Sequence, residues 1–173
     1  MEFHSLTQHI STKIDGICIT DHDLFQAEQK FLKRRVKVFF GAELTTRLGD
    51  ILVYGVSQLP LLYYDLHQTF REIHNNGGII ISAHPFAKQR SAFGEAVYDY
   101  YFDAIEINGG ASKQENESAK QAAKILDVPL VGGSDAHFPD QLNSVATLFE
   151  TKIESMHDIV TAVKNHECKP IFI

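Results

Sequence analysis

The chain has 173 residues, with 16 basic and 22 acidic side chains, a formal net charge of −6 and 44% hydrophobic residues. A chain of this length and hydrophobic content can bury a sizeable core, so we expect one domain over residues 1–173. The composition excludes a disordered, collagen-like or coiled-coil protein. The acidic balance disfavours duplex DNA as the main partner, because nonspecific DNA binding depends on Lys and Arg side chains that neutralise phosphates.

No uninterrupted apolar run approaches the roughly 20 residues that a membrane span requires. Residues 1–11 lack the basic region and apolar core of a secretion signal. The two cysteines, Cys18 and Cys168, are interpreted as reduced thiols, with Cys18 in the core. We therefore expect a cytoplasmic protein with no membrane association.

Short apolar runs alternate with longer stretches of helical spacing along the whole chain. Continuous apolar runs are typical of parallel strands covered on both faces, and their alternation with helices indicates an α/β domain. Ser155 is a suitable cap for the last helix, and Gly77 with Gly78 a suitable stop for an earlier one. Strands are predicted at residues 14–20, 36–40, 51–55, 78–82, 104–108, 130–133, 145–149 and 170–173, and helices at residues 5–12, 24–35, 64–75, 113–126 and 155–165.

Histidine and carboxylate side chains gather where five of these predicted strands end. In an α/β domain the carboxyl ends of parallel strands lie on one face, where the following loops build active sites. Imidazole suits zinc, iron and manganese, whereas carboxylates suit harder ions and can bridge two cations. Any one of these residues taken alone is more often an ordinary loop residue. Asp135 and His137 are stronger together, because a spacing of two places both side chains on the same side.

Five segments in this order resemble the motifs of the PHP (polymerase and histidinol phosphatase) domain family. They are ITDHD at 19–23, GAELT at 41–45, SAHPF at 82–86, EIN at 106–108 and GSDAH at 133–137. The resemblance extends from Ser5 to the C-terminus, and it implies an α/β fold, a distorted (β/α)7 TIM-like barrel of the PHP type. It also implies a metal-dependent phosphoesterase that holds two or three divalent ions, Mn, Zn or Fe.

The matched motif positions imply which residues form the site. Glu43 would be the carboxylate that bridges the ions, and Glu43, His84, Asp135 and His137 would carry the catalytic roles. The implied metal ligands are His22, Glu43, His84, Asp135 and His137, with Asp21 and Glu106 as further candidates.

The chain departs from the family pattern at its start. The family opens with a strand that carries His-x-His and supplies two ligands, and this chain contains no His-x-His. The interpretation is a barrel without its first strand, because the sequence begins late. His4 either approaches the site from this end or is a frayed terminal residue. Asp50, where many members have His, is a turn residue at the start of a strand or, as the alternative, a modest contributor to the site.

A complete site of this kind would activate a water for attack on phosphorus, and no nucleophilic side chain is evident. Three cations near the motifs, Arg90, Lys88 and Arg47, are the candidates to bind phosphate, and Arg90 is preferred because its forked donors suit phosphate oxygens. The basic stretch at residues 30–37 is interpreted as a solvated face, and the aromatic residues at 98–102 as core.

Two functions from different classes follow. The first is a metal-dependent phosphoesterase that hydrolyses a phosphate mono- or diester of a small molecule, nucleotide or oligonucleotide. The alternative is a truncated or non-catalytic PHP-like domain that binds metal or a partner. A missing strand would expose neighbouring strand edges, so a homodimer through these edges is also expected.

Overall fold

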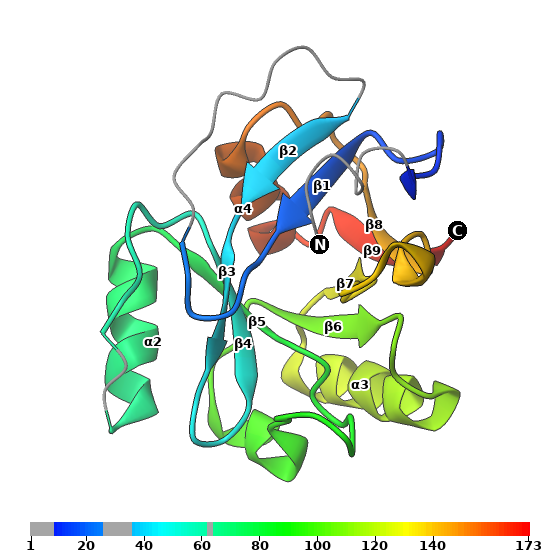
Figure 1. Cartoon of the computed structure of the whole chain (residues 1–173). Helices are drawn as coiled ribbons and strands as arrows, with labels where there is room; N and C mark the ends of the chain where they lie inside the picture. Colours follow the sequence, from blue (N-terminus) through cyan, green and yellow to red (C-terminus); the bar gives the residue numbers. More distant parts are fainter. Residues whose placement is uncertain (1–8, 26–35, 62–63) are drawn as a thin grey trace.

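The computed structural model describes residues 9–25, 36–61 and 64–173. Within these ranges no helix is long and apolar enough to cross a bilayer. The elements in chain order are β1 (Gly16–Ile19), β2 (Lys37–Phe40), β3 (Ala42–Thr45), β4 (Asp50–Tyr54), α2 (Leu66–Asn75), β5 (Ile79–Ser82), η1 (Gly94–Asp99), β6 (Ala104–Asn108), α3 (Lys113–Leu126), β7 (Leu130–Gly133), η2 (Pro139–Gln141), β8 (Val145–Phe149), α4 (Met156–Lys164) and β9 (Cys168–Phe172) (Figure 1).

The strands form one central sheet and two small ones. The central sheet has the order β3-β4-β5-β6-β7, and the pairs β1-β2 and β8-β9 form two-stranded sheets. β1 runs parallel to β2, and its continuation meets β3 at a parallel bridge between His22 and Glu43. The end of β1 is thereby fixed beside the edge strand of the central sheet.

The expected (β/α)7 TIM-like barrel is wrong, because no closed barrel is formed by the residues that the structure describes. β4 runs antiparallel to both β3 and β5, and β8 runs antiparallel to β9. In the central sheet only β5, β6 and β7 form the parallel ladder that a barrel would repeat throughout, and the parallel pair β1-β2 forms a separate sheet. The physical reason lies in the turn between Thr45 and Asp50, which is too short for a crossover helix and forces a hairpin. The fold is a mixed α/β arrangement of several small sheets.

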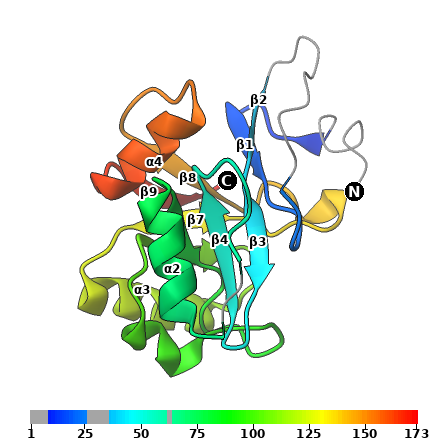
Figure 2. The same cartoon turned by 90° about the vertical axis from the view of Figure 1, so that its left-hand side faces the viewer.

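The outer face of the central sheet is covered by α2 and α3, as Figures 1 and 2 show from two sides. Phe70 and Ile73 of α2 are buried in the same apolar cluster as Ala119 and Ala122 of α3. Phe102, which precedes β6, is fully buried among them and contacts Phe70 edge-on at 5.2 Å between ring centroids. The central sheet contributes Ala42, Leu44, Ile51, Val53, Ile80, Ile105 and Ile107 to this cluster, and β8 contributes Val145.

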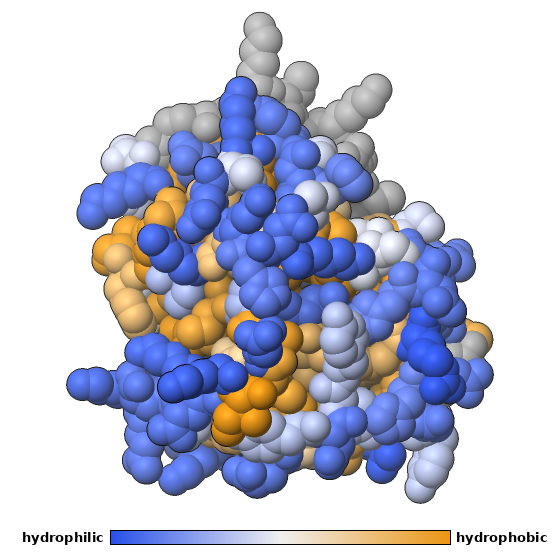
Figure 3. Space-filling view, turned by 180° about the vertical axis from the view of Figure 1, so that it is seen from behind, coloured by the Kyte–Doolittle hydropathy of each residue, from blue (hydrophilic) through white to orange (hydrophobic). Residues whose placement is uncertain are grey.

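The inner face of the sheet packs against α4. Leu52 and Ile81 lie in a second cluster with Val160 and Val163 of α4, whereas their neighbours in sequence belong to the first cluster. This alternation follows the two-residue period of a strand, and it explains why β4 and β5 read as continuous apolar runs. The face away from Figure 1 is mostly hydrophilic, with smaller hydrophobic areas between the polar side chains (Figure 3).

Most predicted elements in the described ranges are confirmed, often to within two residues at each end. Ser155 caps α4 through its side chain, and Asn76 with Gly77 ends α2. The strand β3 was not predicted, because Gly41 between β2 and β3 resembled the start of a loop. The prediction that Cys18 lies in the core is wrong, since its side chain is exposed. The predicted helices at 5–12 and 24–35 lie largely outside the described residues.

The junction between β7 and β8 depends on one hydroxyl. Thr147 Oγ1 accepts a hydrogen bond from the Gly132 N–H at 2.9 Å and donates one to the Gly132 carbonyl at 3.0 Å. A Cβ at Gly132 would lie 2.4 Å from the Ala146 carbonyl oxygen, so the two backbones approach too closely for any other side chain. The hydroxyl therefore replaces a regular ladder at this point.

Thr147→Val should reduce the free energy of unfolding by about 1–3 kcal/mol, because it leaves two partly buried backbone groups unpaired without changing side-chain shape. The measurement is urea unfolding followed by circular dichroism. Thr147→Ser, which keeps the hydroxyl, should retain most of the stability. Equal losses for the Val and Ser variants would contradict this role.

Candidate metal centre

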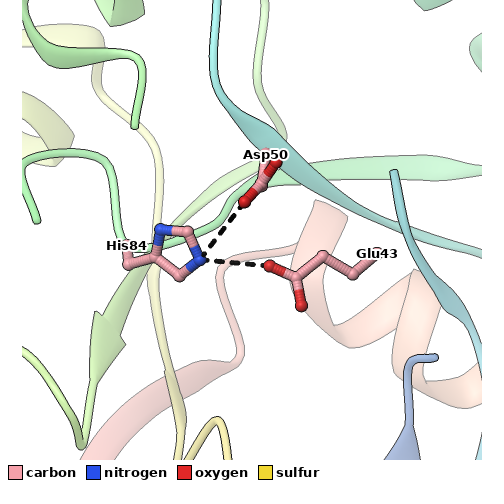
Figure 4. A group of neighbouring side chains, drawn as sticks. All are labelled: Glu43, Asp50 and His84. Atoms are coloured by element: carbon pink, nitrogen blue, oxygen red, sulfur yellow. Dashed lines mark hydrogen bonds and ion pairs between the residues drawn. The ribbon is translucent and has the colours of Figure 1, made fainter. Parts of the chain in front are cut away.

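Three buried ionisable side chains meet at one end of the central sheet. His84 Nε2 lies 3.1 Å from Glu43 Oε1 and 3.8 Å from Asp50 Oδ2 (Figure 4). Each residue offers one ligand atom, and the three atoms all lie within 4.8 Å of one another. We call Glu43, Asp50 and His84 the buried triad.

The β3-β4 hairpin brings the two carboxylates together. Glu43 lies within β3, and Asp50 opens β4 directly opposite Thr45. The Thr46 hydroxyl donates to the Gly49 carbonyl at 2.6 Å and accepts from the Gly49 N–H at 3.2 Å, which fixes the turn. A tight turn therefore places two acidic side chains from one short segment beside the same histidine.

His84 follows β5 with a positive φ of 30°, a region that few residues other than glycine adopt. Its backbone N–H donates to Glu106 Oε2 at 2.9 Å, and only 3% of its side chain is exposed. Strain of this kind persists where surrounding contacts fix the residue, and it is common at functional sites. Glu106 thus fixes the backbone of His84, and Glu43 contacts its imidazole.

Burial makes the ionised forms of these carboxyl groups unfavourable. Burial raises the pKa of the Asp50 carboxyl, and the nearby Glu43 carboxylate raises it further. Burial also raises the pKa of Glu106. For His84 burial acts to lower the pKa, but the hydrogen bond with Glu43 and the charges of Glu106, Glu43 and Asp50 outweigh it, so the pKa is raised. A cation at this point is favoured by all these groups.

The polar atoms of the buried triad are not all satisfied by the protein. In the part of the chain that the structure describes, Asp50 Oδ1 and His84 Nδ1 are buried without a hydrogen-bond partner, as is Ser82 Oγ beside them. Buried polar atoms are nearly always paired, so such orphans call for an ion or a water. The two carboxylates and one imidazole form a donor set that suits zinc, manganese or iron, so the residues fit a divalent metal ion.

A second group of ionisable side chains, His22, Asp135 and His137, lies near the buried triad. Asp135 has a positive φ of 50° and pairs with the guanidinium of Arg90. His137 Nδ1 lies 3.6 Å from Asp135 Oδ1, and its ring centroid is 6.2 Å from that of His22. Both imidazoles are about half exposed, whereas the Asp135 side chain is only 9% exposed. His22 Nε2 lies 3.8 Å from Glu43 Oε2, so it links this group to the buried triad.

Glu43 and His84 of the buried triad line a cavity of about 750 Å³ together with His22, Asp135 and His137. Its walls are formed by β1, by the inner face of the central sheet and by β8, with residues such as Ile17, Leu52 and Ala146. A volume of this size falls within the range of small-molecule sites. The ionisable residues that line it are Asp15, Asp21, His22, Glu43, His84, Glu106, Asp135 and His137, together with Cys18, Lys13, Lys37 and Tyr54.

The structure thus brings all seven sequence-predicted ligand positions to one cavity, but it separates two predicted phosphate-binding residues from it. Arg47 donates from Nε to the Tyr64 carbonyl at 3.1 Å and lies over the Tyr64 ring. Lys88 is exposed and makes its described contacts through Glu115. Arg90 reaches the cavity edge through Asp135. His4 lies outside the described residues.

The place of Asp50 was underestimated by sequence reasoning. The preferred interpretation, a turn residue at the start of a strand, is correct for its position, but its side chain is only 7% exposed and faces His84. The available signal was the pairing of Glu43 and Asp50 across a turn of hairpin length. Asn108 was also missed, although it lies between Glu106 and Asp135.

Comparisons with known proteins test the resemblance to the PHP family. A family model described as PHP-associated matches residues 113–168, which is consistent with a relationship to the PHP family. The uncharacterized protein MJ1587 of Methanocaldococcus jannaschii is 28% identical over 98 residues, which cover 54% of this chain and 57% of that relative. The chain therefore matches little more than half the length of this relative.

A solved structure shares the fold. The crystal structure of PsfC from Pseudomonas syringae PB-5123 superposes with a TM-score of 0.77 over 98% of this chain and 82% of that chain, at 18% sequence identity. At this identity the likeness concerns the fold alone.

Asp50→Asn should change stability and metal affinity in opposite directions. The folded protein raises the Asp50 pKa, so the ionised carboxylate destabilises the metal-free fold at pH 8, and the amide removes that penalty. The melting temperature without metal should rise, by about 2–4 °C for each kcal/mol, while Mn²⁺ affinity falls. Calorimetry with and without Mn²⁺ measures both.

The matched control is Asp99→Asn, because Asp99 is exposed at the end of η1. This variant should change neither quantity. A lower melting temperature for metal-free Asp50→Asn, or an unchanged Mn²⁺ affinity, would count against a metal site at the buried triad.

Proposed function

We propose that this chain, which residues 113–168 relate to the PHP family, is a metal-dependent phosphoesterase. The single observation that supports the proposal is the buried triad, with its unpaired Asp50 and His84 atoms. Two carboxylates and an imidazole buried together are unfavourable unless a cation is held between them. The reaction is hydrolysis of a phosphate mono- or diester.

Two sets of residues would hold divalent ions. Glu43, Asp50 and His84 form the buried set, and His22, Asp135 and His137 form the more exposed set on the far side of Glu43. When bound, the metal would supply a Lewis acid for phosphoryl oxygens and lower the pKa of a water. Manganese, zinc and iron are the ions that this mixture of ligands suits.

The protein would orient the ester through Arg90. Its guanidinium now pairs with Asp135 at the cavity edge, which is the position from which forked donors can reach phosphate oxygens. Asp135 would hold the guanidinium there until a phosphate competes for it. Arg47 and Lys88 lie farther from the cavity and would act on an extended substrate only.

The size and lining of the cavity point to a small phosphorylated molecule or a nucleotide as the substrate. Part of the cavity wall is apolar, with Leu52, Ile81 and Val131. The alcohol portion of a phosphate ester can be partly desolvated against it. The wall does not select among sugars, bases and other alcohols. A cytoplasmic location is part of the same proposal.

The test combines metal analysis of the purified chain with assays of p-nitrophenyl phosphate and bis-p-nitrophenyl phosphate in Mn²⁺. His84→Ala should reduce turnover on the order of 10²-fold or more, because it removes a ligand that no neighbour replaces. His157→Ala, an exposed histidine on α4, is the control and should leave turnover unchanged. One metal equivalent or none, with no turnover in the unaltered chain, would reject the proposal.

The second candidate is a non-catalytic PHP-like domain that binds metal or a partner. It is favoured by the edge of β1 that faces away from β2. The backbone N–H of Lys37 donates to the Asp15 carbonyl, and the backbone N–H of Gly41 donates to the Ile19 carbonyl. The carbonyls of Asp15 and Ile19 thus face β2. Because every second residue of a strand faces the same neighbour, the N–H and C=O groups of Cys18 point away from β2. Among the described residues no strand pairs with that edge, so it could pair with a second copy.

Amide hydrogen exchange followed by NMR over a range of protein concentrations tests this pairing. The amides of Ile17 and Ile19, which face β2, should exchange slowly at every concentration and serve as internal controls. The Cys18 amide should become slow only where light scattering detects a dimer. Fast exchange of Cys18 in a dimeric sample would show that the dimer uses another surface.

A further inference from the structure

Asn108 joins the two carboxylates that face each other across the site. It is the last residue of β6 and is 1% exposed. Its side-chain Nδ2 donates to Glu106 Oε2 at 3.0 Å and to Asp135 Oδ2 at 3.2 Å. One neutral amide therefore uses both of its hydrogens on carboxylates, one from β6 and one from the loop that follows β7.

The orientation of this amide is fixed by its other contacts. Asn108 Oδ1 accepts the Gly110 N–H at 2.8 Å, so the NH2 group must face the carboxylates. The Asn108 backbone is held on both sides by Asn116 of α3. Asn116 Oδ1 accepts the Asn108 N–H at 3.0 Å, and Asn116 Nδ2 donates to the Asn108 carbonyl at 3.0 Å.

The same amide connects both halves of the site. Glu106 Oε2 accepts the His84 N–H as well as the Asn108 amide, so it ties Asn108 to the buried triad. Asp135 ties Asn108 to His137 and Arg90. On the other side of Glu106, a Cβ at Gly133 would lie 2.4 Å from Oε1, so only glycine leaves room for this carboxylate.

We propose that Asn108 is a positioning residue that holds Asp135, a carboxylate of the more exposed metal set, at a fixed distance from Glu106, which in turn binds the His84 backbone in the buried triad. The inference rests on the proposed function and adds a residue to it. A neutral donor orients the two carboxylates without adding a charge between them. Residues that orient metal ligands in this way typically change metal affinity 10–100-fold when they are replaced.

The test compares Asn108→Thr with Asn108→Val, two side chains of the same shape that differ in one hydrogen-bond donor. Mn²⁺ alone is the probe, and its binding is followed by the loss of the free-ion EPR signal. Asn108→Val should lose affinity by about 10–100-fold for the weaker of two ions, and Asn108→Thr should lose several-fold less.

Thr147→Val is the stability control, because it weakens the fold at the β7-β8 junction without contacting either carboxylate. It should keep the unaltered Mn²⁺ affinity. Equal affinities of the Thr and Val variants, or a similar loss in Thr147→Val, would overturn the positioning role. If the Val variant does not fold, the Thr variant must still bind the weaker ion less tightly than the unaltered chain.

The readout separates the two proposals. A chain that binds Mn²⁺ with the expected ranking of variants but hydrolyses no phosphate ester would retain the role of Asn108 and reject the phosphoesterase. An unaltered chain that binds no Mn²⁺ would overturn both.

Discussion

The constraint on which the rest of the site depends is the burial of two carboxylates beside one imidazole, a group that favours an added positive charge. Glu43 and Asp50 are buried beside a single imidazole, and burial raises the pKa of Asp50 and of the adjacent Glu106. The hydrogen bond with Glu43 and the surrounding carboxylates raise the pKa of His84, so positive charge is favoured at this point. A divalent ion would meet ligands already in place there. The folded chain thus gives up stability to keep a ligand set assembled.

The surrounding architecture holds that ligand set without contributing further charge. The hairpin turn at Thr46 and Gly49 brings Asp50 beside Glu43, and the end of β5 brings His84 between them. The outer helices α2 and α3 cover the far face of the same strands, so the ligands stand on a rigid sheet. Asn108 and Gly133 continue this support toward Asp135. Amides and glycine orient the carboxylates, and the positive charge is left to the ion and to Arg90.

The sequence predicted which residues gather at one cavity better than it predicted the fold. The positions His22, Glu43, His84, Glu106, Asp135 and His137 all line one cavity. His22, His84, Asp135 and His137 follow strands, whereas Glu43 and Glu106 lie within β3 and β6. The closed barrel did not follow, because apolar runs show that a strand is buried and do not show its direction. The reversal of β4 is set by a four-residue turn, and β3 was hidden by its continuity with β2. Asp50 was predicted only as an alternative contributor to the site and Asn108 was missed, since their contacts across strands are not revealed by spacing along the chain.

The central claim is that Glu43, Asp50 and His84 together hold a metal ion. The most direct measurement is a crystal structure of the chain soaked in zinc, with anomalous scattering recorded on both sides of the zinc absorption edge. The account predicts an anomalous peak bounded by these three side chains, at roughly 2.0–2.2 Å from their ligand atoms. A peak held only by His22 and His137, or no peak at saturating zinc, would contradict it.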